Sequence, residues 1–526
     1  MTDTAAGPPP HPLRLPLFRA LWIATIVSNV GTWMHDAGAG WLMTGLSDAP
    51  IMVALVQAAT TLPMFLFALP GGALADIVDR RRLLILAQFW ALICAGLLAM
   101  ATFQGITGPG LLLALTFALA TGAALSAPAF QAIVPELVPR PSLAEAVALN
   151  SLGINISRAI GPALGGFIIA AAGPAAVFAL NALSVLGVWL VLLRWKRQVS
   201  PTTLPAEHFT AALRAGARYV RHSPALRTVL IRSMGFFLFA SALWAFIPII
   251  ARRELGLSAA GYGAMLGSMG MGAIVGAVLL PHLRRHLSAN GQTIAASLLF
   301  AVVAVGLAFA QSFAQAAAAM ALAGMAWIAM LSSFNVAAQM AAPSWVKARA
   351  LAINLLVFQG SMAAGSAGWG WVAGRIGIQP TLLLSAAGLV LALGLALRWR
   401  IGGDMAGNVS PSSHWPAPVV AVDSPTDRGP VMITVEYRVD PARVKDFTAA
   451  MASLRRIRHR DGAINWGLYE DAADPGRMVE SFVLESWLEH LRQHERVTHA
   501  DREDQETVRA FHLGPEPPLV RHLIAP

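Results

Sequence analysis

Cysteine and charge are both scarce in this sequence. Its single cysteine, Cys94, excludes intrachain disulfides. Only 13% of the 526 residues are charged, whereas soluble domains average roughly a quarter. A cleavable signal peptide is not expected either, because the first apolar run is long, lacks a clear small-residue cleavage site and leads directly into further apolar runs.

Apolar residues make up 56% of the chain and gather in long runs. A membrane helix needs about 20 of them in succession. By this criterion the sequence predicts an all-α polytopic membrane protein with twelve transmembrane helices in two groups of six. The expected spans are 18–44, 51–75, 83–104, 109–134, 146–171, 175–195, 228–250, 258–282, 292–311, 314–341, 351–374 and 378–398.

Charge is concentrated towards the C-terminus. Residues 429–526 hold 13 Lys and Arg and 16 Asp and Glu, a density typical of a soluble domain, whereas residues 1–428 hold 25 and 12. We therefore expect six segments: a Pro-rich leader at 1–16, a six-helix bundle at 17–196, a central loop at 197–227, a second bundle at 228–400, a linker at 401–428 and a soluble domain at 429–526.

The basic residues behind the net charge of +10 lie mostly in short loops between apolar runs. The leader and the even-numbered loops hold most of them, whereas the odd-numbered loops hold only Arg252, Arg253 and Arg375. This asymmetry predicts that both termini and the central loop face the cytoplasm. The expected location is the cell (inner) membrane, as a multi-pass protein. Because these charges serve topology, we expect no nucleic-acid partner.

The two halves of the apolar region are related by one gapless offset of 204 residues. Aligned identities include Gly72 with Gly276, Arg80 with Arg284, Arg81 with Arg285, Asn150 with Asn354, Gly161 with Gly365, Gly166 with Gly370 and Gly173 with Gly377. Two parallel six-helix repeats related by an axis along the membrane normal resemble the major facilitator transporters. The resemblance implies alternating access by rocking of the two halves.

A short charged hairpin between the second and third spans resembles the loop signature of that superfamily. The matching residues are Gly72, Leu74, Ala75, Asp76, Arg80 and Arg81, whereas Ile77 and Asp79 depart from the pattern. The resemblance implies that Asp76 is a conformational latch, with Arg80 and Arg81 as ionic partners or lipid contacts. The alternative is an arginine run that only determines topology. The second half has Leu280 and Leu283 at the acidic positions, so we expect a weaker latch there.

The fifth span contains a dense group of small residues, Gly161, Pro162, Gly165 and Gly166. Small residues let membrane helices approach closely, and proline is tolerated there as a bend. The pattern resembles that of drug/proton antiporters in the same superfamily. Plain helix packing without any meaning for export is the alternative.

Ionisable residues inside spans are costly and are therefore candidates for function. His35 and Asp36 lie in the first span, Arg158 in the fifth and Arg232 at the start of the seventh. Asp36 can alternate between protonation states, as proton coupling requires, and Arg158 can oppose its charge or meet an anionic substrate. The alternatives are a permanent Asp36–Arg158 pair and, for Arg232, a position at the membrane interface.

Polar and aromatic residues in the spans are candidates for lining a central cavity. They are Asn29, Trp33, Gln57, Gln131, Asn155, Trp244, Asn335, Gln339 and Gln359. Such a lining suits small amphipathic organic molecules better than sugars.

The C-terminal segment alternates in pattern as βαββα. Strands are expected at 431–439, 464–470 and 478–487, and helices at 442–458 and 487–499. This order predicts a small α+β domain, which resembles the ferredoxin-like antibiotic-biosynthesis-monooxygenase domains; the resemblance implies dimerisation through paired sheets.

Three histidines of this segment raise the question of a metal site. His490 and His494 lie four residues apart, with His499 beyond. No cysteine or clear carboxylate set accompanies them, so an exposed helix with Glu489 and Arg492 is favoured and no metal or cofactor is expected. Catalysis at Asn465 and Trp466 is not expected either.

Two further stretches indicate a particular branch of the superfamily. Trp33-Met34-His35 in the first span and the segment from Pro128 to Pro139 resemble the enterobactin-exporter-like branch of the superfamily. We therefore expect a proton-coupled exporter of siderophore- or drug-like molecules rather than an enzyme, with small-molecule substrate, protons and membrane lipids as partners. The alternatives are a membrane-anchored sensor or scaffold, and a fused enzyme in which the C-terminal domain carries the activity.

Overall fold

The computed structural model describes residues 11–195, 209–343, 345–402, 410, 412, 415 and 428–525. Parts of the predicted leader, central loop and linker therefore lie outside the described residues. The chain divides into two compact units. The helical unit comprises 1–206, 231–334 and 355–400, and the tail unit comprises 207–230, 335–354 and 401–526.

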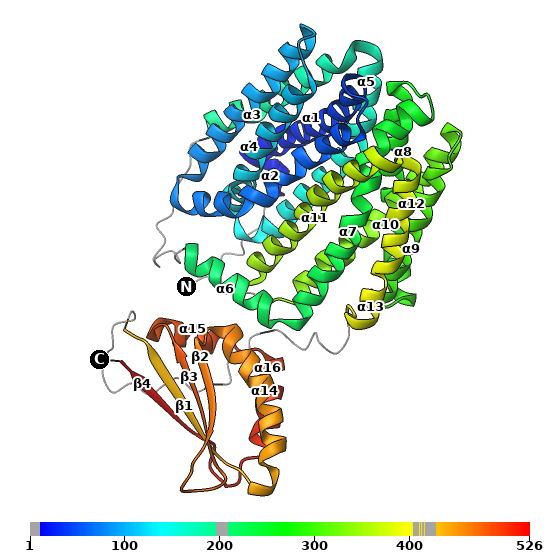
Figure 1. The fold of residues 1–526 in the computed structure, drawn as a ribbon. Helices are drawn as coiled ribbons and strands as arrows, with labels where there is room; N and C mark the ends of the chain where they lie inside the picture. Colours follow the sequence, from blue (N-terminus) through cyan, green and yellow to red (C-terminus); the bar gives the residue numbers. More distant parts are fainter. Residues whose placement is uncertain are drawn as a thin grey trace. The chain divides into compact units, whose positions relative to one another are not determined.

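Long helices account for nearly all of the helical unit (Figure 1). The N-terminal helices are η1 (Pro12–Arg14), α1 (Pro16–Leu46), α2 (Pro50–Ile77), α3 (Arg80–Phe103), α4 (Pro109–Leu137), η2 (Arg140–Ser142) and α5 (Leu143–Arg194). After the central segment follow α7 (Pro224–Ile249), the π-helical η3 (Ile250–Glu254), α8 (Ala259–His286), α9 (Ala289–Ala308), α10 (Phe313–Met340), α11 (Lys347–Ile376), α12 (Ile378–Ala392) and α13 (Gly394–Arg398).

Ten helices of the described chain are long and apolar enough to cross a membrane. The helix α1 is not among them, and Glu145–Arg194 is counted as one. Large apolar side chains such as Phe103, which is 86% exposed, cover outward faces of these helices. Such surface is stable against lipid and costly in water. The protein is therefore a multi-pass membrane protein.

Local sequence explains where these helices begin. Proline occupies the first turn of α1, α2 and α4, where a missing N–H is harmless. The side chains of Asp79, Ser258 and Ser288 accept a backbone N–H at the starts of α3, α8 and α9. The 52-residue α5 is interrupted at Gly173, whose φ of 79° is open to glycine and strained for other residues.

The C-terminal domain is a four-stranded antiparallel sheet with strand order β2-β3-β1-β4. Its elements are β1 (Val431–Arg438), η4 (Pro441–Arg443), α14 (Val444–Asp461), β2 (Asn465–Glu470), β3 (Arg477–Leu484), α15 (Trp487–Arg496), α16 (His499–Arg509) and β4 (Leu519–Ile524). The helices cover one face of the sheet (Figure 1), where alternate residues of β1 and β3 are buried. The order is that of a ferredoxin-like fold.

The predicted βαββα pattern is incomplete, because it lacks the edge strand β4. The segment 487–499, predicted as one helix, contains the whole of α15 and the first residue of α16. The two helices are separated because Thr498 forms a capping box with Asp501 that begins α16.

The predicted central loop 197–227 contains a helix, α6 (Phe209–His222). It packs on α14 within the tail unit. The buried Tyr219 donates a hydrogen bond to the Ala341 carbonyl at 2.7 Å, and Arg460 lies over its ring at 5.8 Å. Arg496 of α15 likewise lies over the Trp345 ring at 4.6 Å. The C-terminal domain therefore holds both α6 and the turn between α10 and α11.

Candidate transport site

The middle of α1 carries the two ionisable residues predicted there. His35 is 1% exposed, packs against Phe178 with ring centroids 4.8 Å apart, and has no hydrogen-bond partner for either ring nitrogen among the described residues. Asp36, the next residue, is half-buried. One turn further along, Trp41 stacks on Tyr262 of α8 at 5.4 Å. This part of α1 therefore faces a helix of the second half of the chain.

Arg158 of α5 lies beside the same part of α1. Its guanidinium sits 5.3 Å from the centre of the Trp33 ring, and its buried Nε has no hydrogen-bond partner in the described chain. No ion pair between Asp36 and Arg158 occurs among the described residues. A cation over an aromatic face is stabilised by the ring quadrupole, so Trp33 rather than Asp36 contacts this charge.

The small-residue group of α5 lies between two helices. A Cβ on Gly161 would meet Trp33 Cβ at 2.5 Å, and one on Gly165 would meet Met34 Cα at 3.1 Å. A Cβ on Gly166 would overlap the Cα of Gly263 in α8. Pro162 lies within the same turn of helix. The predicted motif thus brings α5 into backbone contact with α1 on one side and α8 on the other.

The C-terminal end of α1 is clamped by two arginines that the sequence reasoning did not select. Arg253 donates to the carbonyls of Asp48 at 2.7 Å, Ser47 at 2.7 Å and Thr44 at 3.1 Å, and pairs with the Asp48 carboxylate at 3.1 Å. Arg252 donates to the Thr44 hydroxyl at 3.2 Å. Their position in the sequence is unusual, because they are two of the three basic residues in the odd-numbered loops. This position could have marked them as functional candidates.

The charged hairpin between α2 and α3 connects to α4 and α5 through its arginines. Arg80 pairs with Glu136 of α4 at 2.9 Å, and Arg81 donates to the carbonyls of Leu192 and Leu193 at 3.2 and 2.8 Å. The side chain of Asp76 lies outside the described part of the chain.

Three neighbouring positions complete the geometry of the hairpin. Asp79 caps α3 through the N–H of Arg82 at 2.9 Å, which explains an acid where the superfamily usually has glycine. The helices α2 and α4 approach closely at Gly71, where a Cβ would meet Leu125 Cα at 2.9 Å. A Cβ on Gly72 would meet nothing within 4 Å.

In the second half, the residue equivalent to Arg80 meets a neutral group. Arg284 donates to the Ser332 hydroxyl at 2.9 Å. Arg232, the ionisable candidate at the start of the seventh predicted span, is 5% exposed. It donates to Asn290 at 2.9 Å, Thr293 at 2.9 Å and the Trp399 carbonyl at 3.2 Å. These bonds satisfy a buried charge and identify Arg232 as a structural residue.

The remaining cavity candidates are dispersed. Trp244 packs edge-on against Trp327 at 5.2 Å, and its buried indole N–H has no partner among the described residues. Asn335 accepts a hydrogen bond from Asn354 at 3.3 Å inside the tail unit. Half-buried positions are Asn29, Trp33, Gln57 and Gln359, and exposed positions are Gln131, Asn155 and Gln339.

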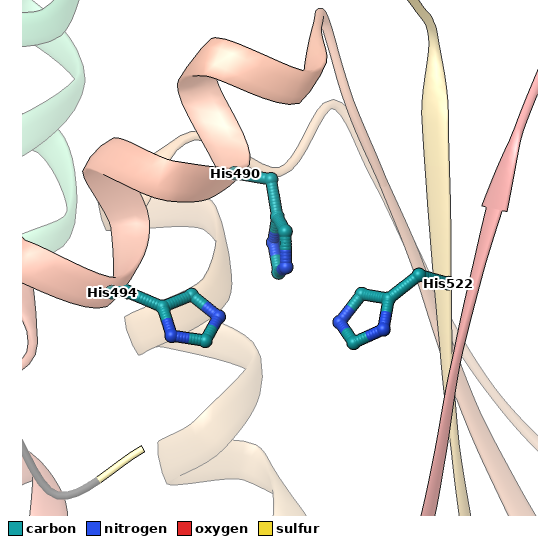
Figure 2. Close-up of side chains that lie close together, drawn as sticks. All are labelled: His490, His494 and His522. Carbon is teal, nitrogen blue, oxygen red and sulfur yellow. The ribbon is translucent and has the colours of Figure 1, made fainter. Parts of the chain in front are cut away.

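In the C-terminal domain, His490 contradicts the prediction of an exposed helix, because it is only 2% exposed. Glu489 and Arg492 do pair, at 2.8 Å. Figure 2 shows the rings of His490 and His494 converging with that of His522 from β4, and one nitrogen from each ring lies within 4.8 Å of the others. His499 is not part of this cluster.

The environment keeps these rings neutral. Burial, together with the neighbouring His494 and His522, lowers the pKa of His490 to about 3, although the nearby amide of Gln493 opposes the shift. Burial and His522 lower the pKa of His494 to about 4. Burial also lowers the pKa of His522. At neutral pH each ring therefore keeps a nitrogen lone pair.

Trp466, a residue considered for catalysis, has a structural role. Its indole N–H donates to Glu480 at 3.0 Å, and Glu480 also accepts two hydrogen bonds from Arg458, at 3.0 and 3.2 Å. Arg458 and Glu480 are both buried. A buried pair of this kind is stable only when its hydrogen bonds are satisfied, and the indole supplies one of them. Asn465 is exposed.

The helical bundle has the fold of the major facilitator class. Similar solved structures include a bacterial homolog of the human lysosomal transporter Spinster in an inward-facing and occupied conformation, with a TM-score of 0.59 and 14% identity, covering 74% of this chain and 97% of that one. A nucleoside transporter, the NupG D323A mutant, gives a TM-score of 0.61 at 14% identity, covering 73% and 100%. At such identities the likeness concerns the fold alone.

The chain belongs to the transmembrane secretion effector family, whose family model matches residues 8–526. It is therefore a transporter and not an enzyme. Its relatives include the enterobactin exporter EntS of Salmonella typhimurium, 29% identical over 320 residues that cover 60% of this chain and 76% of that protein. The EntS of Shigella boydii serotype 18 is 28% identical over 294 residues, or 56% and 69%.

Proposed function

We propose that this protein is a proton-coupled exporter of small amphipathic organic molecules, siderophore- or drug-like in character, acting as an antiporter. The exporter relatives support the direction of transport. The observation that carries the proposal is Asp36, the only carboxylate of α1, next to the buried His35 in a helix that packs against both α5 and α8.

The proposal includes twelve crossings in two six-helix repeats. Counting α1, and dividing α5 at Gly173, brings the ten candidate spans to this number. The 204-residue offset relates Pro109 to Phe313, where α4 and α10 begin, and Leu143 to Lys347, where α5 and α11 begin. It also relates Gly173 to Gly377, whose φ values are 79° and 87°. Equivalent positions thus share unusual backbone conformations, which supports duplication.

Alternating access requires contacts between the halves that can open and close. Arg252 and Arg253 hold the end of α1 to the end of α7, and Gly370 of α11 approaches α2, where a Cβ would meet Ile51 Cα at 3.0 Å. We assign these contacts to the closed external gate of an inner-membrane protein with cytoplasmic termini. Arg80, Arg81 and Asp76 belong to the opposite gate, where the arginines also reach lipid headgroups.

Proton coupling follows from the surroundings of Asp36. A carboxylate that is desolvated favours its neutral form, and one that is hydrated or faces a cation favours its charged form. Rocking of α8 against α1 changes the hydration of Asp36. Arg158, held over Trp33 without a carboxylate partner in the described chain, then attracts either ionised Asp36 or an anionic group of the substrate.

Inside-out vesicles energised with a pH gradient test this role. We expect Asp36→Asn to abolish pH-driven uptake of amphipathic substrates, because Asn cannot bind and release a proton. The variant protein should still fold and insert into the membrane. The matched control is Glu254→Gln, which neutralises an exposed acid at the end of η3 and leaves uptake near the wild-type rate. Unchanged transport in Asp36→Asn would remove Asp36 from the mechanism.

A role for the C-terminal domain in regulation or sensing has its own support. The domain holds α6 and the turn before α11 in one compact unit, through Tyr219 and Trp345. Its open sheet face exposes Met432, Leu519 and Leu523, and Met432 pairs with Leu523 across β1 and β4. We propose that two copies of the domain pair through this face.

A further inference from the structure

The histidine cluster of the C-terminal domain has the composition of a metal site. His490 and His494 lie four residues apart on α15, so both rings project from one face of that helix. His522 comes from β4, where it is paired with the buried Ile433 and therefore faces the helices. His522 thus lies beside His490 and His494, which precede it in the sequence by 32 and 28 residues (Figure 2).

Two observations separate this cluster from ordinary packing of histidines. First, His490 is almost fully buried, and neither of its ring nitrogens makes a hydrogen bond of normal geometry to any described residue. A buried polar group without a partner calls for an explanation such as a bound ion. Second, one nitrogen from each of the three rings lies within 4.8 Å of the others, although the rings come from two separate elements, α15 and β4.

We infer that His490, His494 and His522 form a binding site for a borderline divalent transition-metal ion such as Zn²⁺. Imidazole nitrogens are preferred ligands of this class. Tetrahedral coordination at Zn–N distances of about 2.0–2.1 Å places nitrogens about 3.3 Å apart. The present separations, up to 4.8 Å, close to that value by small ring rotations of the half-buried His494 and His522.

The ligand set also indicates the kind of site. The cluster supplies three protein ligands from the described residues, so a tetrahedral ion keeps one position for water or another donor. Binding joins the last strand of the sheet to α15, the helix whose Arg496 contacts Trp345. Metal binding would therefore stiffen the part of the domain that holds the turn before α11. The site does not depend on the proposed direction of transport or on proton coupling.

Equilibrium metal binding to the full-length chain tests the assignment. Tag-free protein is stripped with a chelator, dialysed against ZnCl₂ and assayed for bound zinc by mass spectrometry and calorimetry. We expect about one Zn²⁺ per chain. The variants His494→Gln and His522→Gln should each weaken binding by more than the roughly 10- to 100-fold typical of losing an outer-shell partner. The control His499→Gln, on the neighbouring helix and outside the cluster, should bind as the wild type does.

Co²⁺ gives a second measurement that needs no variant. Co²⁺ bound by three imidazoles in a tetrahedral site should produce visible d–d absorption in the wild-type protein, and Zn²⁺ should abolish it. Failure to retain zinc, or equal zinc binding by the wild type and the His494→Gln/His522→Gln double variant, would overturn the assignment. A Co²⁺ spectrum typical of octahedral coordination would also overturn the assignment.

Discussion

Several arginines of the helical unit donate to backbone carbonyls at the ends of helices. Arg253 binds carbonyls at the end of α1, Arg81 those at the end of α5, and Arg232 the carbonyl of Trp399 after α13. The last carbonyls of a helix lack intrahelical donors and carry partial negative charge. Each guanidinium therefore stabilises a helix end and ties it to another helix.

Arg253→Gln should loosen the contact between the ends of α1 and α7. Glutamine loses both the charge and the fork of donors that reaches three carbonyls. We expect a cysteine at Ser47, in a Cys94→Ala background, to react with a maleimide several-fold faster in detergent when Arg253 is replaced. Arg375→Gln is the control, because Arg375 stacks on Trp371 of its own helix at 3.7 Å. Equal rates in all three proteins would exclude a clamp at Arg253.

At the scale of elements, the part of α5 before Gly173 approaches two neighbouring helices through its glycines. Its glycines face α1 at Gly161 and Gly165 and α8 at Gly166. Without a hydrophobic driving force between helices in lipid, such close packing supplies much of the attraction. The same helix also carries Gly187, where an added Cβ would meet nothing within 4 Å.

Gly166→Ala and Gly187→Ala form a matched pair within α5. The first places a methyl group against Gly263 N at 2.6 Å and Ala259 O at 2.8 Å, and should cost about 1–3 kcal/mol of stability through overpacking. The second should be neutral or slightly stabilising, because alanine favours helix. Thermal unfolding of the purified proteins measures both. A melting temperature for Gly166→Ala at or above that of Gly187→Ala would refute the close α5–α8 contact.

At the scale of the whole molecule, the tail unit combines parts of the chain that are distant in sequence. Residues 207–230 and 335–354 join the C-terminal domain, although both adjoin membrane helices. Arg460 contacts the Tyr219 ring of the first segment, and Arg496 contacts the Trp345 ring of the second. Each arginine also pairs with an acid, Arg460 with Asp461 at 2.8 Å and Arg496 with Glu489 at 2.9 Å.

Deleting residues 429–526 separates the roles proposed for this domain. We expect pH-driven uptake into inside-out vesicles to persist within a few-fold of the full-length rate, because the helices that carry Asp36 and Arg158 lie outside the deletion. The mass measured in detergent should fall from that of a dimer to that of a monomer. Loss of transport in a correctly inserted truncated protein would instead make the domain part of the transport mechanism. An unchanged oligomeric state would rule out dimerisation through the sheets.

Much of this protein follows from the sequence by itself. Apolar runs of membrane length specify the helices, because backbone groups in lipid must bond within their own segment. The predominantly helical membrane fold, the small-residue group of α5 and most elements of the C-terminal α+β domain all follow from such local patterns. Edge strand β4 was missed because six residues after a proline-containing turn carry little periodic signal.

Other features depend on which segments meet in three dimensions, and local patterns do not contain that information. The hairpin sequence did not indicate that Arg81 binds the carbonyls at the end of α5, which the structure shows. His490 and His494 alone suggested an exposed helix, until β4 brought His522 beside them. Sequence thus determined which elements form and which faces are apolar. Only tertiary structure decided the partners of the arginines and histidines, because their long or directional side chains bind groups supplied by remote segments.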